Sequence, residues 1–197
     1  MGMTLRRIVG LVALLNLGYF GVEFAAALAI GSVSLFADSV DFLEDASINL
    51  LILLALGWSA SWRSVIGKGL AGIILIPGIA TLWMAWTNFS SGIPPNPVTL
   101  SLVGAGALTV NVICALLLVR YRSASGSLTR AAYLSARNDA VANIAVIVTG
   151  PVTAYTLSAW PDLLVGLGIA LMNADAAREV YTAAQRERLS ADELTRT

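Results

Sequence analysis

The chain has 197 residues, of which 57% are hydrophobic and 12% are charged, and its formal net charge is zero. A soluble protein carries about 25% charged residues, so this composition and a mean hydropathy of +0.79 indicate an integral membrane protein. The balanced charge argues against nucleic acid as a partner, because phosphate backbones attract proteins with an excess of Lys and Arg. Histidine is absent, and the single cysteine, Cys114, excludes a disulfide within the chain. Any metal site must therefore use carboxylates, amides, hydroxyls, carbonyls and water.

Six apolar segments follow one another along the chain. Each is close to the ~20 residues that a helix needs to cross a ~30 Å hydrocarbon core. We therefore predict an all-α membrane protein with six transmembrane helices, at residues 8–30, 34–58, 66–88, 98–119, 131–157 and 161–182. We expect residues 1–183 to form one membrane domain, and residues 184–197 to form a tail that is too short to fold by itself.

The first segment carries two polar residues, Asn16 and Glu23, which are about two turns apart and share one face. Two arginines precede this segment, as in a signal peptide, but Glu23 and the spans that follow favour a helix that is retained. We expect Asn16 and Glu23 to line a polar interior and to do no more. Cys114, within the fourth segment, is expected to be a small core residue.

The second segment holds four acids, Asp38, Asp41, Glu44 and Asp45. At the centre of a membrane helix one carboxylate costs roughly 2.5–3.5 kcal/mol on insertion scales, so the cluster indicates a functional site. Three of the acids form a stripe at helical spacing, which Asn49 continues, and Glu44 lies beside it. Pairing with basic groups is an alternative reading, but only Arg137 lies at comparable depth. Asp41 and Asp45, one turn or ~5–6 Å apart, suit joint coordination of one divalent cation.

The third and fourth segments contain no acid. Pro77-Gly78 predicts a kink in the third segment, which ends with interfacial Trp83 and Trp86, and Trp58 is the corresponding anchor of the second. In the fourth segment the sequence GAGA at 104–107 permits close helix approach. Its one amide is Asn111.

The fifth segment repeats the spacing of the second. Ser135 and Asp139 are four residues apart, and Asn143 extends their face by one turn. The second and fifth helices run in opposite directions, so they can be neighbours that surround one ion with about four oxygens near mid-membrane. A helix–helix hydrogen bond is the alternative for Asp139 alone. Arg137 projects away from this face, and its role and that of Glu44 stay open. Pro151 predicts a second kink, and the sixth helix opens at the sequence WPD, residues 160–162.

The basic residues outside Arg137 all fall on one side of the predicted membrane. By the positive-inside rule, both termini are therefore cytoplasmic, in an inner or plasma membrane. These residues are Arg6, Arg7, Arg63, Lys68, Arg120, Arg122, Arg130, Arg178, Arg186, Arg188 and Arg196.

Over nearly its whole length the chain resembles the membrane domain of the cation diffusion facilitators. The resemblance is carried, in order and spacing, by Asn16, Glu23, GSVSLFAD at 31–38, DFLED at 41–45, NDAVAN at 138–143 and WPD at 160–162. It implies export of divalent metal ions against a flow of protons, with Asp41, Asp45 and Asp139 as metal ligands. Where the family commonly has histidine this chain has Ser135, which weakens the expected selectivity for zinc. We expect no counterpart of the family's C-terminal cytoplasmic domain, and therefore a homodimer held by membrane helices, with the third as candidate contact.

The resemblance implies a secondary transporter with no permanently bound cofactor, and no ATP-binding G-x-x-x-x-G-K-[ST] motif occurs in the sequence. We expect Zn²⁺ or Cd²⁺ as the exported ion, bound by Asp41, Asp45, Asp139 and Ser135. Less certain ligands are Asp38, Asn138 and Asn143. Because oxygen ligands favour harder ions, an exporter of Mn²⁺ or Fe²⁺ is the alternative. A Mg²⁺-dependent membrane phosphotransferase fits less well, since Phe42 and no glycine follows the first aspartate of the pair.

Overall fold

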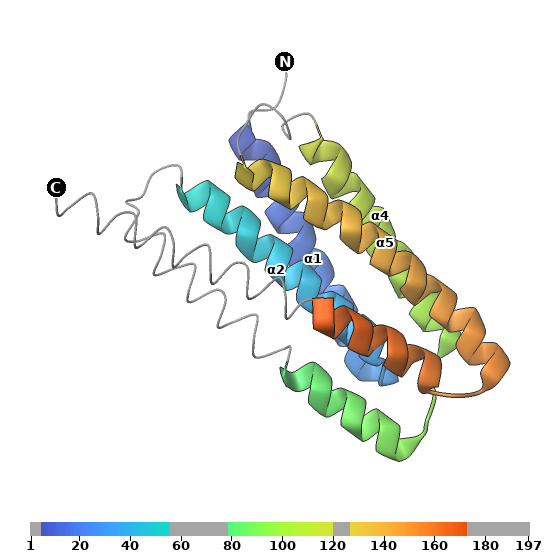
Figure 1. Ribbon diagram of the computed structural model, residues 1–197. Helices are drawn as coiled ribbons and strands as arrows, with labels where there is room; N and C mark the ends of the chain where they lie inside the picture. Colours follow the sequence, from blue (N-terminus) through green and yellow to red (C-terminus); the bar gives the residue numbers. More distant parts are fainter. Residues whose placement is uncertain (1–4, 56–78, 120–126, 173–197) are drawn as a thin grey trace, which may run out of the picture.

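The computed structural model describes residues 5–55, 79–119 and 127–172 of the chain. Within these ranges the protein is all-helical, with six helices and no strand, as the sequence predicts. Four of the helices are α1 (Leu5–Ile30), α2 (Val33–Ala55), α4 (Pro97–Leu118) and α5 (Ser127–Thr156), and the others comprise residues 79–91 and Trp160–Met172 (Figure 1). The bounds agree with the predicted spans to within a few residues wherever both ends are described. Trp58, Pro77 and Gly78 lie outside the described residues, as do 173–197.

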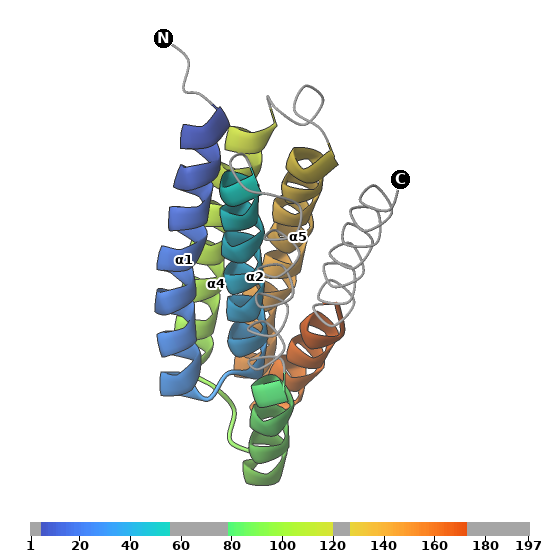
Figure 2. The ribbon, with the colours of Figure 1, turned by 90° about the vertical axis from the view of Figure 1, so that its left-hand side faces the viewer.

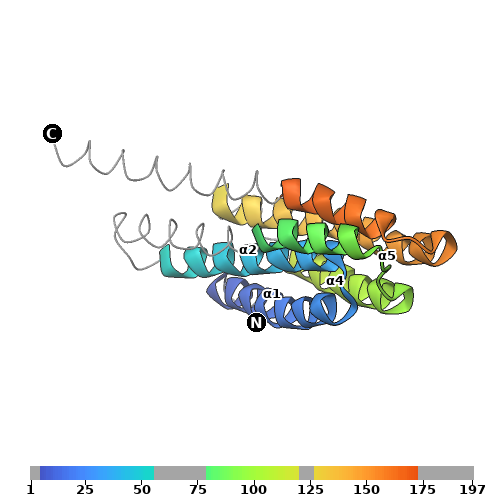
Figure 3. The ribbon, with the colours of Figure 1, turned by 90° about the horizontal axis from the view of Figure 1, so that it is seen from below.

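The four long helices pack as a ring in which α1 contacts α2 and α4, and α5 contacts the same two helices. Figure 2 shows them side by side and nearly parallel or antiparallel. The two shorter helices lie on the other side of α2 from α1, as the view from below shows (Figure 3). They meet the first turn of α2 in an apolar cluster that includes Val33, Ala85 and Leu163. The ring places α2 and α5 face to face.

Two of the described helices, α1 and α4, are each long and apolar enough to cross a membrane, and Trp160–Met172 is a shorter apolar helix. α2 is long enough to cross, but it carries the four acids. In a bilayer, apolar surface facing lipid gives no driving force for helix association, so close packing and polar contacts between helices must hold the ring together.

Small residues bring α4 close to both of its neighbours. A Cβ atom on Gly104 would lie 3.1 Å from a methyl of Val146 in α5, and one on Gly106 would collide with the hydroxyl of Tyr19 in α1. That hydroxyl donates a hydrogen bond to the carbonyl of Val103 at 2.6 Å. The GAGA sequence therefore permits close approach of α4 to α5 on one side and to α1 on the other, as predicted.

Pro151 stands inside α5, where its ring removes the backbone donor that would bond to Ile147 four residues earlier. Ser101 of α4 supplies the missing donor, because its hydroxyl bonds to the carbonyl of Ile147 at 3.0 Å. Gly150 permits this approach, since a Cβ there would collide with the Ser101 side chain. A polar group in lipid must find a partner within the protein, and here the partner comes from the adjacent helix.

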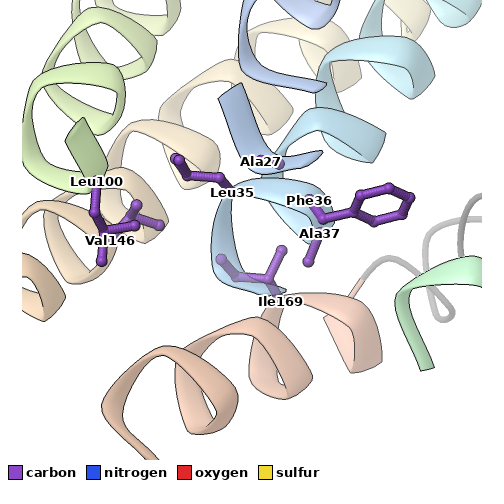
Figure 4. Close-up of a cluster of buried hydrophobic side chains, with 7 residues drawn as sticks. All are labelled: Ala27, Leu35, Phe36, Ala37, Leu100, Val146 and Ile169. Carbon is purple, nitrogen blue, oxygen red and sulfur yellow. The ribbon is translucent and has the colours of Figure 1, made fainter. Parts of the chain in front are cut away.

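Two apolar clusters lie toward the two ends of the ring. The first joins α1, α2 and α4 and consists of Ile8, Val9, Val12, Ile52, Cys114 and Leu118. The second lies near the turn between α1 and α2 and is shown in Figure 4; it consists of Ala27, Leu35, Phe36, Ala37, Leu100, Val146 and Ile169. Along the long helices, the positions between these clusters include the buried polar residues Asn16, Glu23, Asp38, Asp45, Asn111 and Asn143. Cys114 is free and buried in the first cluster, in agreement with its predicted core position.

Candidate metal-binding site

Three of the four acids of α2 are buried within the protein. Asp38 is completely buried, Asp45 and Glu44 are also buried, and Asp41 is half-buried. Asn49 continues the stripe, and its amide group donates to the carbonyl of Asp45 at 2.8 Å. The stripe predicted from helical spacing is therefore largely buried within the protein.

Asp139 of α5 comes close to this stripe. Within the described part of the chain, Asp139 lies close enough to Asp41 to repel it electrostatically, as do Asp38, Glu44 and Asp45 of α2 itself. Asp139 is half-buried and has an interaction partner in the structure. Acids separated by almost one hundred residues in the sequence thus lie within electrostatic reach of each other across the α2 and α5 interface. This juxtaposition is the one that the paired i, i+4 spacings predict.

Asn143, one turn beyond Asp139, is fully buried, and both atoms of its amide lack a hydrogen-bond partner among the described residues. The backbones of Ser135, Arg137 and Asn138 belong to α5. The side chains of these three lie outside the described part of the chain, so their predicted positions are neither supported nor opposed. Among the described residues, no three acid or cysteine side chains are gathered closely enough to hold one ion. Asp41 and Asp139 are therefore close to each other, but the described acid and cysteine side chains do not form a complete set of metal ligands.

The start of α2 is fixed by Asp162, which belongs to the helix that begins at Trp160. One oxygen of Asp162 accepts from the hydroxyls of Ser32 and Ser34 at 2.7 and 2.6 Å and from the backbone N–H of Ser34 at 3.2 Å. The other oxygen accepts from the N–H of Val33 at 2.7 Å. A carboxylate at a helix N-terminus also complements the helix dipole. Asp162 thereby anchors the helix that carries the acids.

Sequence reasoning missed this role of Asp162 and used it only to mark the start of a helix. The sequence could have indicated an anion at this position. Ser32 and Ser34 flank the first residue of α2, and the free backbone N–H groups at the start of a helix favour an anion. Gly31 makes the preceding turn possible, since its φ of 69° lies in the left-handed region. Gly166 lets the two helices meet, because a Cβ there would lie 2.7 Å from the backbone of α2.

Amides form a further polar group toward the other end of the ring. Asn16 of α1 accepts a weak hydrogen bond from the Cys114 thiol at 3.8 Å, and its own N–H₂ has no partner among the described residues. Asn49 and Asn111 are also buried and each has an unpartnered carbonyl oxygen. Between the two apolar clusters, several buried groups that can accept or donate hydrogen bonds therefore have no partner among the described residues.

The chain matches the family described as the cation efflux transmembrane domain over residues 9–184. A comparison with curated proteins returns no match. The matched range contains every acid discussed above and all of the described helices except the first four residues of α1, and it agrees with the resemblance drawn from the sequence motifs. The protein therefore belongs to the cation efflux family of integral membrane transporters, which move divalent metal cations.

Proposed function

We propose that the protein exports divalent cations of the Zn²⁺ and Cd²⁺ type from the cytoplasm in exchange for protons. The cargo ion binds between α2 and α5, held by Asp41, Asp45 and Asp139, with Ser135 as fourth ligand. The observation that carries the proposal is the approach of Asp139 to Asp41 across the two helices. Four oxygen donors suffice for tetrahedral Zn²⁺.

The exchange follows from what a carboxylate can hold. A carboxylate binds a proton or a metal ion with the same oxygens, so metal binding releases protons. On the cytoplasmic side the incoming cation displaces protons from the aspartates. After the ring opens toward the other side, protons return to the aspartates and the cation leaves. Each cycle therefore couples one outward metal movement to inward proton movement.

The direction of transport rests on the positive-inside distribution of Lys and Arg, which puts both chain termini in the cytoplasm. The Gly31 turn then lies at the outer end of the ring and the cluster of Ile8 and Leu118 at the cytoplasmic end. We place the protein in an inner or plasma membrane, with residues 1–183 as the transporter domain and 184–197 as a cytoplasmic tail. The functional unit is a homodimer held by membrane helices.

Metal-dependent proton movement in vesicles tests this function. Purified protein is reconstituted with a pH-sensitive dye inside, and Zn²⁺, Cd²⁺ or Mn²⁺ is added outside. We expect Zn²⁺ and Cd²⁺ to move protons and Asp45→Asn to abolish the signal. A matched control is Glu44→Gln, which removes a neighbouring acid of α2 that lies off the stripe. Equal signals from protein-free vesicles, or a Mn²⁺ response that exceeds the Zn²⁺ response, would contradict the proposal or its metal assignment.

A further inference from the structure

A second layer of polar groups lies next to the aspartates, and the proposed function assigns no ligand to it. Glu23 of α1, Asp38 of α2 and Asn143 of α5 are each 0% exposed. Both carboxylate oxygens of Glu23, both of Asp38 and both amide atoms of Asn143 lack a hydrogen-bond partner among the described residues. Three helices thus bring buried polar atoms to the interior, and the described residues provide no binding partner for these atoms.

The apolar cluster of Figure 4 sets these three residues at one level. Ala27, Leu35 and Val146 pack together in that cluster. Glu23 precedes Ala27 by four residues, Asp38 follows Leu35 by three, and Asn143 precedes Val146 by three. α2 runs in the direction opposite to α1 and α5. Glu23, Asp38 and Asn143 therefore each lie about one helical turn further from the Gly31 turn than the cluster residue of the same helix.

The contacts within the layer agree with this register. The side chains of Glu23 and Asp38 lie within hydrogen-bonding reach of each other, although two carboxylates offer only acceptors. The Tyr19 hydroxyl lies within electrostatic reach of both acids, but its proton is already donated to the carbonyl of Val103. Two buried carboxylates that are both charged and have no donor are strongly unfavourable, so a proton or a metal cation must join them.

A divalent cation meets the requirements of the layer. Two carboxylates neutralise its charge, and with the carbonyl oxygen of Asn143 they offer up to five oxygen ligands. Carboxylate and amide oxygens suit Mn²⁺ and similar hard divalent ions. The layer lies one turn from the Asp41 and Asp139 pair along both α2 and α5, so an ion would move only about 5 Å between the two positions.

We propose that Glu23, Asp38 and Asn143 form a second divalent cation site, on the Gly31-turn side of the aspartates, which receives the cargo ion before its release. This inference rests on the proposed function and deepens it. Asp38 and Asn143 then belong to the second site, and Glu23 is a ligand and no longer a mere part of a polar lining. Two weak sites in series promote conduction, because an ion that binds at the first favours departure from the second.

Manganese binding to the full chain in lipid nanodiscs tests the second site. The probe is Mn²⁺ alone, titrated to millimolar concentration, with stoichiometry measured by calorimetry and by electron paramagnetic resonance. We expect wild-type protein to bind two ions per chain, and the two ions, about 5 Å apart along the helices, to show spin–spin coupling. Glu23→Gln and Asp38→Asn should each bind one ion and lose the coupling, whereas the control Glu44→Gln should keep both.

Asp45→Asn separates this inference from the proposed function. That variant should lose the ion of the first site and keep the one that Glu23→Gln removes, so the double variant should bind none. If Asp45→Asn still bound two ions, the first site would be misplaced, whatever Glu23→Gln does. If wild-type protein bound one uncoupled ion and Glu23→Gln bound it equally well, a shared proton would hold the carboxyl pair, and the second site would be refuted.

Discussion

Replacement of Asp162 should destabilise the protein more than any other single change at the Gly31-turn end of the ring. Its carboxylate accepts four hydrogen bonds, from the hydroxyls of Ser32 and Ser34 and from the backbone of Val33 and Ser34. All of these groups are buried. Alanine at position 162 would leave all four donors without their acceptor.

The two hydroxyls can rotate toward each other, since their oxygens are 3.3 Å apart, but the two backbone N–H groups cannot move. A hydrogen bond to a charged group contributes about 1.5–3 kcal/mol, so two lost backbone bonds amount to ~3–6 kcal/mol. We expect Asp162→Ala to lower the free energy of unfolding by that amount. Asp162→Asn should cost less, because one acceptor oxygen remains while the new N–H₂ group faces a donor.

The assay is equilibrium unfolding of the purified protein in mixed micelles, followed by tryptophan fluorescence. Thr156→Val is the matched control, because its hydroxyl bonds only within its own helix, to the carbonyl of Val152. Its effect should stay within about 0.5 kcal/mol. A change of that small size for Asp162→Ala would refute the view that Asp162 anchors α2.

Three further predictions concern topology, specificity and assembly. A reporter that is active only in the cytoplasm should be active when it is fused to the C-terminus, because Arg and Lys lie on one side of the predicted membrane. Activity of a reporter that works only in the periplasm would contradict the predicted orientation. Ser135→His adds an imidazole, which suits Zn²⁺ better than a hydroxyl does, so calorimetry should show increased affinity for Zn²⁺ relative to Mn²⁺ and a new pH dependence near ~6.5. An unchanged preference would place Ser135 outside the ligand set. Cross-linking in membranes should trap a homodimer, and a fully active monomer in nanodiscs would contradict that expectation.

Much of the fold could be predicted because it depends on local properties of the sequence. Segment length and hydropathy gave the helices, and helical spacing gave the stripe of Asp38, Asp41 and Asp45. The approach of Asp139 to that stripe followed from two equal spacings on helices of opposite direction. No knowledge of the helix crossing was needed for this prediction, since each helix carries oxygen-bearing side chains at that spacing.

The remaining contacts depend on how far one helix is shifted along another, and the sequence does not set that shift. Glu23 was expected only to line the interior, yet it lies against Asp38. Ser101 bonds to the carbonyl left free by Pro151, a contact that requires α4 and α5 to be in one particular register. Asp162 reaches Ser32 across 130 residues of chain. The proline and the serines gave local signals of unmet hydrogen bonds, but not the identity of their partners.

The central claim is that a cargo ion binds to Asp41, Asp45 and Asp139, and calorimetry of Zn²⁺ and Cd²⁺ binding tests it most directly. Each Asp→Asn change keeps the size of the side chain and removes a charge. Even loss of a group that merely supports a metal ligand typically weakens binding 10–100-fold. We therefore predict a loss of at least about tenfold for each of the three variants, with fewer protons released, while Glu44→Gln binds as wild type does. Wild-type affinity and proton release in Asp45→Asn would contradict the account.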